Sequence, residues 1–195
     1  MGAQEHRSLA PAPGLVKIFI MTASDSRTPE TNQGGRLVKE LAQAAGFVIA
    51  GESLLPDDRD ALRAAVAELC AREAADVILL TGGTGIAHRD NTVEAVAALL
   101  DKRLDGYGEL FRMLSFAEIG SAAMLSRAIA GTIGRVALFA MPGSPAGVRL
   151  AMERLILPEL THVVGELKRT NARADGAGHG SHGHHTKGGH GQPQH

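Results

Sequence analysis

The sequence has one cysteine, no tryptophan and few aromatic residues of any kind, and each shortage excludes a class of protein. A single cysteine cannot form a disulfide framework within the chain, so a reducing cytoplasmic location fits best. Cys70 stands among apolar residues at helical spacing, and we expect a buried, unreactive thiol there. Aromatic residues make up 3% of the chain, too few to build the stacking platforms that bind single-stranded nucleic acid.

The chain also lacks an excess of one charge and long hydrophobic runs. Lys and Arg number 20 and Asp and Glu number 21, and the net charge of -1 does not attract nucleic acid or anionic lipid to the whole surface. No stretch approaches the roughly 20 apolar residues that a membrane helix needs. The beginning of the sequence contains no apolar core of a signal peptide. We therefore expect a cytoplasmic protein with neither nucleic acid nor membrane among its partners.

Composition divides the chain into three parts. Residues 1–14, with Pro11 and Pro13, are predicted to be a flexible lead, and residues 15–168 to form one domain of ordinary size. Residues 169–195 contain six of the nine histidines and almost no apolar side chain, which predicts a disordered tail. The histidines of this tail suit either a weak metal-binding segment or a merely solvated one.

Within the domain, short apolar runs alternate with stretches of helical spacing. The runs at 15–20, 47–53, 76–80 and 135–141 predict strands. This alternation predicts an α/β fold with a mostly parallel sheet that helices cover on both faces. Residues 104–116 look less regular, and residues 118–131 are predicted to form a helix that Gly131 ends. A last helix is expected from Pro145, with a kink or break at Pro158.

A glycine-rich loop follows the most apolar of these strands. Thr81-Gly82-Gly83-Thr84-Gly85 would present backbone N–H groups at the carboxyl end of the sheet, where open α/β sheets bind ligands and where anions are favoured. No Lys-Ser/Thr pair follows as in a P-loop, and the spacing is not that of a dinucleotide fingerprint. The residues alone therefore predict a small ligand that carries phosphate.

Two acidic positions stand on the same edge of the predicted sheet. Asp90 lies at the mouth of a helix for which Asn91 and Glu94 have the spacing of a capping box. Asp57 follows the second strand. A carboxylate beside a phosphate site is unfavourable unless a cation lies between them, and Mg²⁺ is commonly held by one or two carboxylates together with phosphate oxygens. The alternative is that these acids merely cap helices.

Two further loops end at the same edge. The loop after the first strand offers hydroxyls, an acid and a guanidinium in Ser24, Asp25 and Arg27. The loop after the last strand contains Pro142, Gly143 and Ser144, and Ser144 is placed either to cap the following helix or to bind a ligand. Four strand ends with small polar residues and glycines favour a ligand site over four unrelated turns.

These motifs resemble a known family, the MogA/MoaB proteins of molybdenum-cofactor biosynthesis, which are molybdopterin adenylyltransferase-like. The stretches that carry the resemblance span nearly the whole predicted domain, and they are SDSRTPETNQGG (24–35), LPDDRDAL (55–62), DVILLTGGTGIAHRDNTVEA (76–95), FAEIGSAAMLSRAIAG (116–131) and AMPGSPAGV (140–148). The SDSRT sequence is closer to the MoaB branch.

The resemblance implies a three-layer α/β/α fold, a homotrimer or homohexamer, and contacts with other molybdenum-cofactor enzymes. It implies transfer of AMP from ATP to the terminal phosphate of molybdopterin, with Mg²⁺ as cofactor. Asp57 and Asp90 match the catalytic, metal-linked acids. The other residues that we expect to bind substrate or nucleotide are Ser24, Asp25, Arg27, Thr81, Gly82, Gly83, Thr84, Gly85, Ser126, Pro142, Gly143 and Ser144.

One departure from the family pattern leaves the function open. Asn32-Gln33-Gly34-Gly35 stands where the family often has Asp-x-Ser-Gly, which removes an acid and a hydroxyl. A molybdopterin carrier without turnover is therefore an alternative to the adenylyltransferase. A second alternative is a nucleotide-pyrophosphate enzyme similar to the CinA-like proteins, although their Asp-Asp pair differs from Arg89-Asp90 here.

Overall fold

The computed structural model describes residues 10–175, with the backbone alone for residues 170–175. Its central sheet has six strands in the order β2-β1-β3-β6-β5-β4. The strands are β1 (Lys17–Ala23), β2 (Val48–Leu55), β3 (Val77–Thr81), β4 (Lys102–Arg103), β5 (Ile129–Ile133) and β6 (Val136–Met141). The first three and β6 are mutually parallel, whereas β5 and β4 extend the sheet in antiparallel fashion.

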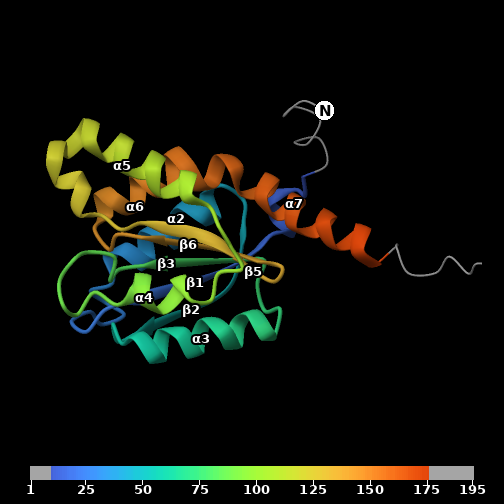
Figure 1. Cartoon of the computed structure of the whole chain (residues 1–195), viewed down its shortest axis with the longest axis horizontal. Coiled ribbons are helices and arrows are strands. Elements are labelled where there is room, and N and C mark those ends of the chain that lie inside the picture. The colour runs from blue at the N-terminus through green and yellow to red at the C-terminus, as the bar shows by residue number, and fades with distance from the viewer. Residues whose placement is uncertain (1–9, 176–195) are drawn as a thin grey trace, which may run out of the picture.

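Helices cover both faces of the sheet, so the predicted three-layer α/β/α fold is confirmed (Figure 1). One layer contains α2, α5, α6 and α7, and the other contains α3 and α4. The bounds are α2 (Gln33–Ala44), α3 (Arg59–Ala71), α4 (Thr92–Ala97), α5 (Asp105–Ile119), α6 (Pro145–Ala151) and α7 (Leu157–Asp175), with short helical turns η1 (Pro13–Leu15), η2 (Gly120–Leu125) and η3 (Met152–Ile156).

The apolar runs of the sequence form strands because each strand has two faces to bury. Along β3, Val77 and Leu79 pack toward the α2, α5, α6 and α7 layer, whereas Ile78 and Leu80 pack toward α3 and α4. All five residues of β3 are buried, as expected for a central parallel strand. This packing fixes the register, and hence the edge at which every parallel strand ends.

The predicted helix at residues 118–131 is wrong. The apparently irregular piece before it forms the regular helix α5, whose buried residues Tyr107, Phe111 and Ser115 recur at helical spacing. The helix ends at Gly120, which has a φ of +62°. Gly131 does not end a helix but lies within β5, where a Cβ would lie only 2.3 Å from the carbonyl oxygen of Lys102. The β-branched residues of β5 thus pair with β6.

Pro158 does not break the last helix. A π-helical turn, η3, joins α6 to α7 and ends two residues before this proline. Proline lacks an N–H and its ring crowds the carbonyl one turn earlier, and the wide turn accommodates both effects. The helix α7 continues to Asp175, beyond the boundary expected at residue 168.

The predicted flexible lead and histidine-rich tail fall mostly at residues 1–9 and 176–195, which lie outside the described residues. Across residues 10–175, no helix is long and apolar enough to cross a bilayer.

Candidate functional site

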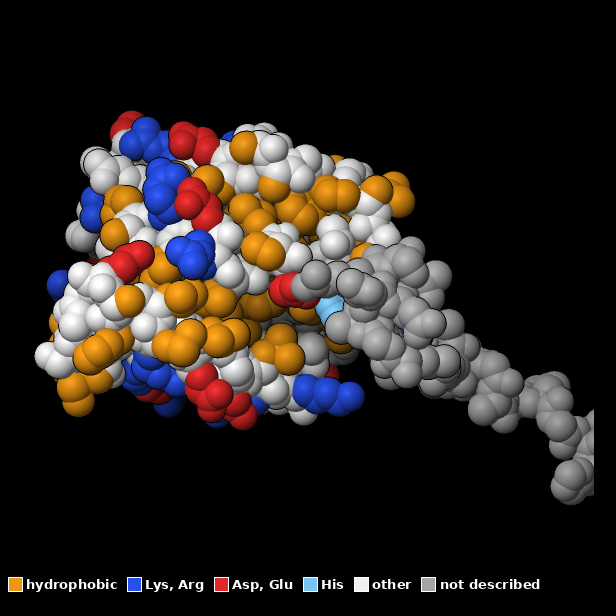
Figure 2. Space-filling model, turned by 90° about the horizontal axis from the view of Figure 1, so that it is seen from above, with side chains coloured by type: hydrophobic (Ala, Val, Ile, Leu, Met, Phe, Trp, Pro, Cys, Tyr) orange, Lys and Arg blue, Asp and Glu red, His pale blue; other side chains and the backbone are white. Residues whose placement is uncertain are grey.

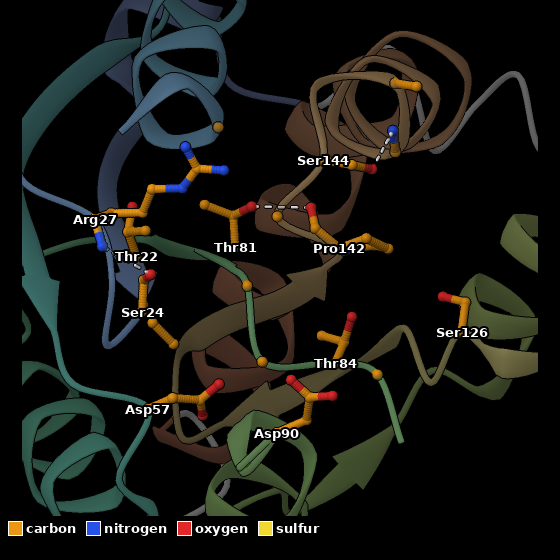
Figure 3. Close-up of a pocket in the computed structure, with 18 of the residues that line it drawn as sticks. Thr22, Ser24, Arg27, Asp57, Thr81, Thr84, Asp90, Ser126, Pro142 and Ser144 are labelled. Atoms are coloured by element: carbon orange, nitrogen blue, oxygen red, sulfur yellow. Dashed lines mark hydrogen bonds between the residues drawn. The ribbon is translucent and has the colours of Figure 1, made fainter. Parts of the chain in front are cut away.

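A cavity of about 620 Å³ lies where the parallel strands end. The loops that follow β1, β2, β3 and β6 converge there, and Figure 3 shows their side chains facing a common space. Every site residue predicted from the sequence lines it, namely Ser24, Asp25, Arg27, Asp57, Thr81, Gly82, Gly83, Thr84, Gly85, Asp90, Ser126, Pro142, Gly143 and Ser144. The structure thus brings these residues together, and their chemical roles stay predictions.

Two glycines of the loop after β3 have no room for a side chain. At Gly82, with a φ of +98°, a Cβ would lie 2.2 Å from the carbonyl oxygen of Ala23. At Gly83, with a φ of +59°, a Cβ would lie 2.3 Å from Oδ2 of Asp57. Both residues adopt a backbone conformation that favours glycine. The close approach brings the loop backbone and the Asp57 carboxylate together at the cavity wall.

Hydrogen bonds join the loops after β3 and β6. The Thr81 hydroxyl donates to the carbonyl oxygen of Pro142 at 3.0 Å, and the N–H of Gly82 donates to Met141 at 3.0 Å. In the loop after β6, Oγ of Ser144 caps α6 by accepting from the N–H of Gly147 at 3.2 Å. Of the two roles that the sequence left open for Ser144, the structure shows the cap, and the residue also lines the cavity.

The loop after β1 uses its polar side chains to hold its own shape. Oγ of Ser24 accepts from the N–H groups of Ser26 at 3.3 Å and of Arg27 at 3.2 Å. The Arg27 guanidinium donates to the carbonyl oxygen of Thr31 at 3.2 Å. Asn32 caps α2 through the N–H of Gly35 and donates to the Thr22 hydroxyl at 2.9 Å. Asn32 therefore has a structural role in this chain.

Asp57 is 9% exposed and lies at the centre of a small network. Its Oδ1 accepts from the N–H of Asn91 at 3.0 Å, and its own N–H donates to Asp25 at 2.9 Å. Burial is the main reason that the pKa of Asp57 is raised; the Asn91 hydrogen bond opposes this, and the nearby Asp90 and Asp25 carboxylates add to it. Asp58, not Asp57, caps α3 through the N–H of Ala61 at 2.8 Å.

Asp90 faces the same space as Asp57 (Figure 3). Its Oδ2 accepts from the N–H of Ala87 at 2.8 Å and would lie 2.7 Å from a Cβ at Gly85. Asn91 precedes α4 as expected, but the predicted capping box is wrong. The side-chain amide of Asn91 donates instead to the carbonyl oxygens of Asp57 at 2.8 Å and Arg89 at 3.2 Å. The acids after β2 and β3 are therefore tied together through Asn91.

The donor set of this site fits Mg²⁺ that reaches it with a phosphate ligand. In the part of the chain that the structure describes, no group of three or more His, Cys, Asp or Glu side chains could enclose a metal. Mg²⁺ keeps several waters and is usually held by one or two carboxylates plus substrate phosphates. Asp57 and Asp90, beside the N–H groups of the glycine loop, provide that set.

Sequence reasoning missed one wall of the cavity. Helix α5 contributes Phe111, Ser115, Glu118 and Ile119, and η2 contributes Leu125. Tyr107, Phe111 and Ser115 recur every four residues, and this spacing was the available signal for the helix. The cavity therefore has a polar side made by loops and a more apolar side made by α5.

Cys70 lies on α3 and does not line the cavity. The thiol is half-buried rather than buried, and burial raises its pKa to about 11, with a further contribution from Asp101. A thiol that stays protonated near neutral pH is a poor nucleophile, in agreement with the expected unreactive side chain.

Together, the fold and the cavity define an open α/β domain with a cavity at the carboxyl ends of its parallel strands, which is where domains of this class bind their ligands. The family model described as "Probable molybdopterin binding domain" matches residues 19–162. Molybdenum cofactor biosynthesis protein B of Bacillus cereus is 52% identical over 170 residues, which are 87% of this chain and 99% of that protein. The chain belongs to this family, the MoaB proteins of molybdenum cofactor biosynthesis.

Solved structures agree with this assignment. A crystal structure of a molybdenum cofactor biosynthesis protein B is 53% identical, with a TM-score of 0.78, and the match covers 82% of this chain and 99% of that one. The tungsten cofactor synthesizing protein MoaB from Pyrococcus furiosus is 34% identical, with a TM-score of 0.72 and coverage of 80% and 99%. The expected likeness to the MoaB branch is confirmed.

Proposed function

We propose that the chain binds molybdopterin and, with Mg²⁺, transfers AMP from ATP to the terminal phosphate of molybdopterin. The observation that carries this proposal is the convergence of the glycine loop with two carboxylates on one cavity wall. Backbone N–H groups suit phosphate oxygens, and paired acids beside them suit a cation that phosphate brings along. A cavity of about 620 Å³ falls within the usual range for a small-molecule site.

The two sides of the cavity suit the two parts of such substrates. Phosphate groups fit the loops, where Gly82, Gly83 and Thr84 lie beside both acids. The wall of Phe111, Ile119 and Leu125 offers an apolar surface to a flat ring. We assign the phosphates to the loop side and a ring system to the α5 side.

The proposed reaction is an in-line displacement at the α-phosphorus of ATP. An oxygen of the molybdopterin phosphate forms the new bond to phosphorus, and the bond from the α-phosphorus to the bridging oxygen breaks. Pyrophosphate leaves with that electron pair. The reaction consumes no oxidant, so positioning and charge stabilisation are what the protein must supply.

The side chains of this chain would supply both. Asp57 and Asp90 would hold Mg²⁺, which when bound offsets the negative charge of the phosphates. The amides of the glycine loop would orient the phosphates, and the Thr81 to Pro142 hydrogen bond would keep the loops after β3 and β6 at a fixed spacing.

A non-catalytic molybdopterin carrier is the second candidate. The observation that favours it is Asn32, whose side chain is engaged by Gly35 and Thr22 and brings no acid to the cavity. A carrier would keep the pocket and bind pterin without turnover.

We also propose a homo-oligomer. Large hydrophobic side chains are exposed along α5 and η2, namely Leu110, Met113, Phe116, Ile119, Met124 and Leu125. Figure 2, seen from above the layer that contains α5, shows hydrophobic side chains gathered over this face. Contiguous exposed apolar side chains of this kind favour a protein interface, and a second copy of the chain is the expected partner.

An assay of AMP transfer to purified molybdopterin tests the function. We expect Asp90→Asn to lower the rate by at least about 100-fold, the size typical of removing an electrostatic contributor. Asp60→Asn is the matched control, because it removes an exposed acid near Asp57 that does not line the cavity. Pterin binding without AMP transfer by the wild type would support the carrier, and equal rates in wild type and Asp90→Asn would reject the catalytic assignment.

A further inference from the structure

The segment between η2 and β5 lies against the glycine loop and carries an arginine that the proposed mechanism does not use. The N–H of Arg127 donates to the carbonyl oxygen of Thr84 at 3.1 Å. Its Nε donates to the carbonyl oxygen of Gly85 at 2.8 Å, and one terminal nitrogen donates to that of Asp90 at 3.0 Å. Backbone and side chain of one residue thus hold three points of the loop that carries Asp90.

Glu94 holds the arginine in turn. Both carboxylate oxygens of Glu94 accept hydrogen bonds from the Arg127 guanidinium. Nη1 donates to Oε1, and Nη2 donates to Oε2 at 3.3 Å. Hydrogen bonding to Arg127 is the main reason that the pKa of Glu94 is lowered, which keeps the carboxylate charged. The planar guanidinium is therefore fixed in orientation as well as in position.

The bonds from Arg127 enclose the turn that sets the Asp90 side chain. Gly85 and Asp90 lie at the two ends of this turn, and within it Oδ2 of Asp90 accepts from Ala87. Both ends of the turn are thus tied to one planar group, and the Asp90 carboxylate points into the cavity beside Asp57 (Figure 3). Residues 86–89 of the turn are exposed, and without the arginine such a loop would sample several conformations.

We propose that Arg127 is a positioning residue, which braces residues 85–90 through its guanidinium so that the Asp90 carboxylate is held at the metal-binding position. The inference rests on the proposed function, because it assigns Asp90 the role given there. Arg127 itself does not line the main cavity and acts through the loop.

Lysine cannot replace this brace. A single ammonium group keeps the charge, but it cannot reach two carbonyl oxygens and both oxygens of Glu94 in one plane. The variant Arg127→Lys therefore separates geometry from charge. Arg72→Gln is the control for loss of an arginine, because Arg72, directly after α3, forms an exposed pair with Glu68 and lies outside the cavity wall.

The experiment measures binding of Mn²⁺, as a substitute for Mg²⁺, by electron paramagnetic resonance in the presence of ATP. We expect Arg127→Lys to weaken Mn²⁺ binding by about 10-fold to 100-fold, as for residues that orient metal ligands, and Arg72→Gln to change it less than about 2-fold. Glu94→Gln, which leaves the guanidinium in place, is expected to fall between them. In the transfer assay, raising the Mg²⁺ concentration should restore much of the lost rate of Arg127→Lys.

Hydrogen exchange of the backbone amides of Ala87 and Asn91 gives a second readout that needs no ligand. These amides should exchange at least about 10-fold faster in Arg127→Lys, while those of β3 remain protected. Unchanged exchange, or a lowered melting temperature with unchanged Mn²⁺ affinity, would overturn the proposal.

If the wild type binds Mn²⁺ but transfers no AMP, the proposed function fails, and the exchange and Mn²⁺ results still decide the role of Arg127. If Arg127→Lys does not fold, Glu94→Gln provides the same comparison.

Discussion

The parallel strands β2, β1, β3 and β6 end at the cavity, whereas β5 runs in the opposite direction and starts beside it. The parallel part therefore reaches the cavity with the loops that follow its strands. The antiparallel part reaches the cavity with Ser126, which precedes β5, whereas the adjacent Arg127 lies outside the cavity wall and bonds to the loop after β3. The loops after the parallel strands carry most of the residues that line the cavity, and Arg127 of the antiparallel part holds one of these loops from outside the cavity. The direction of a strand thus decides whether the residues after it or the residues before it lie near the cavity.

A matched pair of glycine variants tests this contrast with the largest expected effect. Gly83 and Gly134 have nearly the same backbone, with φ of +59° and +55°. A Cβ at Gly83 would overlap Asp57, whereas a Cβ at Gly134 meets no atom of residues 10–175 within 4 Å. We expect Gly83→Ala to lower the free energy of unfolding by about 3 kcal/mol, from strain and overpacking together, and Gly134→Ala by about 1 kcal/mol.

Chemical denaturation of both variants gives these values, and ATP binding measured by calorimetry shows the effect on the site. Gly83→Ala should lose binding, because Asp57 must move, and Gly134→Ala should keep it. Equal binding by the two variants would mean that the parallel part does not hold the ligand site at this loop.

A second pair of variants tests the support given by the antiparallel part. At Gly108 on α5, a Cβ would lie 2.6 Å from the carbonyl oxygen of Ala128, just before β5, whereas at Gly106 none of the described residues comes within 4 Å. Gly108→Ala should lower the free energy of unfolding by about 1 to 2 kcal/mol, because α5 must move off β5. Gly106→Ala should raise it by about 0.5 kcal/mol through helix propensity. If thermal and chemical denaturation show the same change in stability for Gly108→Ala and Gly106→Ala, α5 does not pack closely on β5.

The ion pair between Glu94 and Arg127 joins the two parts and gives the smallest effect. The folded-state pKa of Glu94 is lowered, so the pair contributes stability above the unfolded-state pKa, near 4.3, and loses it as the pH falls through the folded-state value. Because Glu94 is 46% exposed, we expect at most about 1 kcal/mol. Urea denaturation at pH 7 and pH 3 should show a larger loss for the wild type than for Glu94→Gln, and parallel losses would contradict the pairing.

The parallel part was predictable from the sequence, and the antiparallel part was not. The run from Val77 to Leu80 predicts a strand because it is apolar on both faces. Once the strands are known to be parallel, the loop after each of them must lie at the carboxyl edge of the sheet. The run around Ile129 is short, contains Gly131 and becomes a strand only by pairing with β6, which local sequence does not reveal. Its neighbour α5 contains Gly106 and Gly108, which masked its helical spacing.

The site shows the same limit. Asp57 and Asp90 could be placed at one edge because each follows a parallel strand. The partners of Asn91, by contrast, depend on which atoms lie nearby after folding. Local spacing predicts a cap with Glu94, but Asn91 bonds to the carbonyl oxygen of Asp57, and Glu94 pairs with Arg127, which is 33 positions away. Long-range partners of this kind are what the sequence pattern could not supply.

We propose above all that Asp57 and Asp90 hold one metal ion together. Titration of Mn²⁺ with ATP present, followed by electron paramagnetic resonance for Asp57→Asn, Asp90→Asn and the double variant, tests it most directly. We expect one tightly bound ion per wild-type chain and a loss of at least about 10-fold in affinity for each single variant. The double variant should bind the ion less than about 3-fold more weakly than the weaker single variant, because the two effects are coupled. Single variants that bind the ion as tightly as the wild type, or effects that multiply as for independent sites, would contradict it.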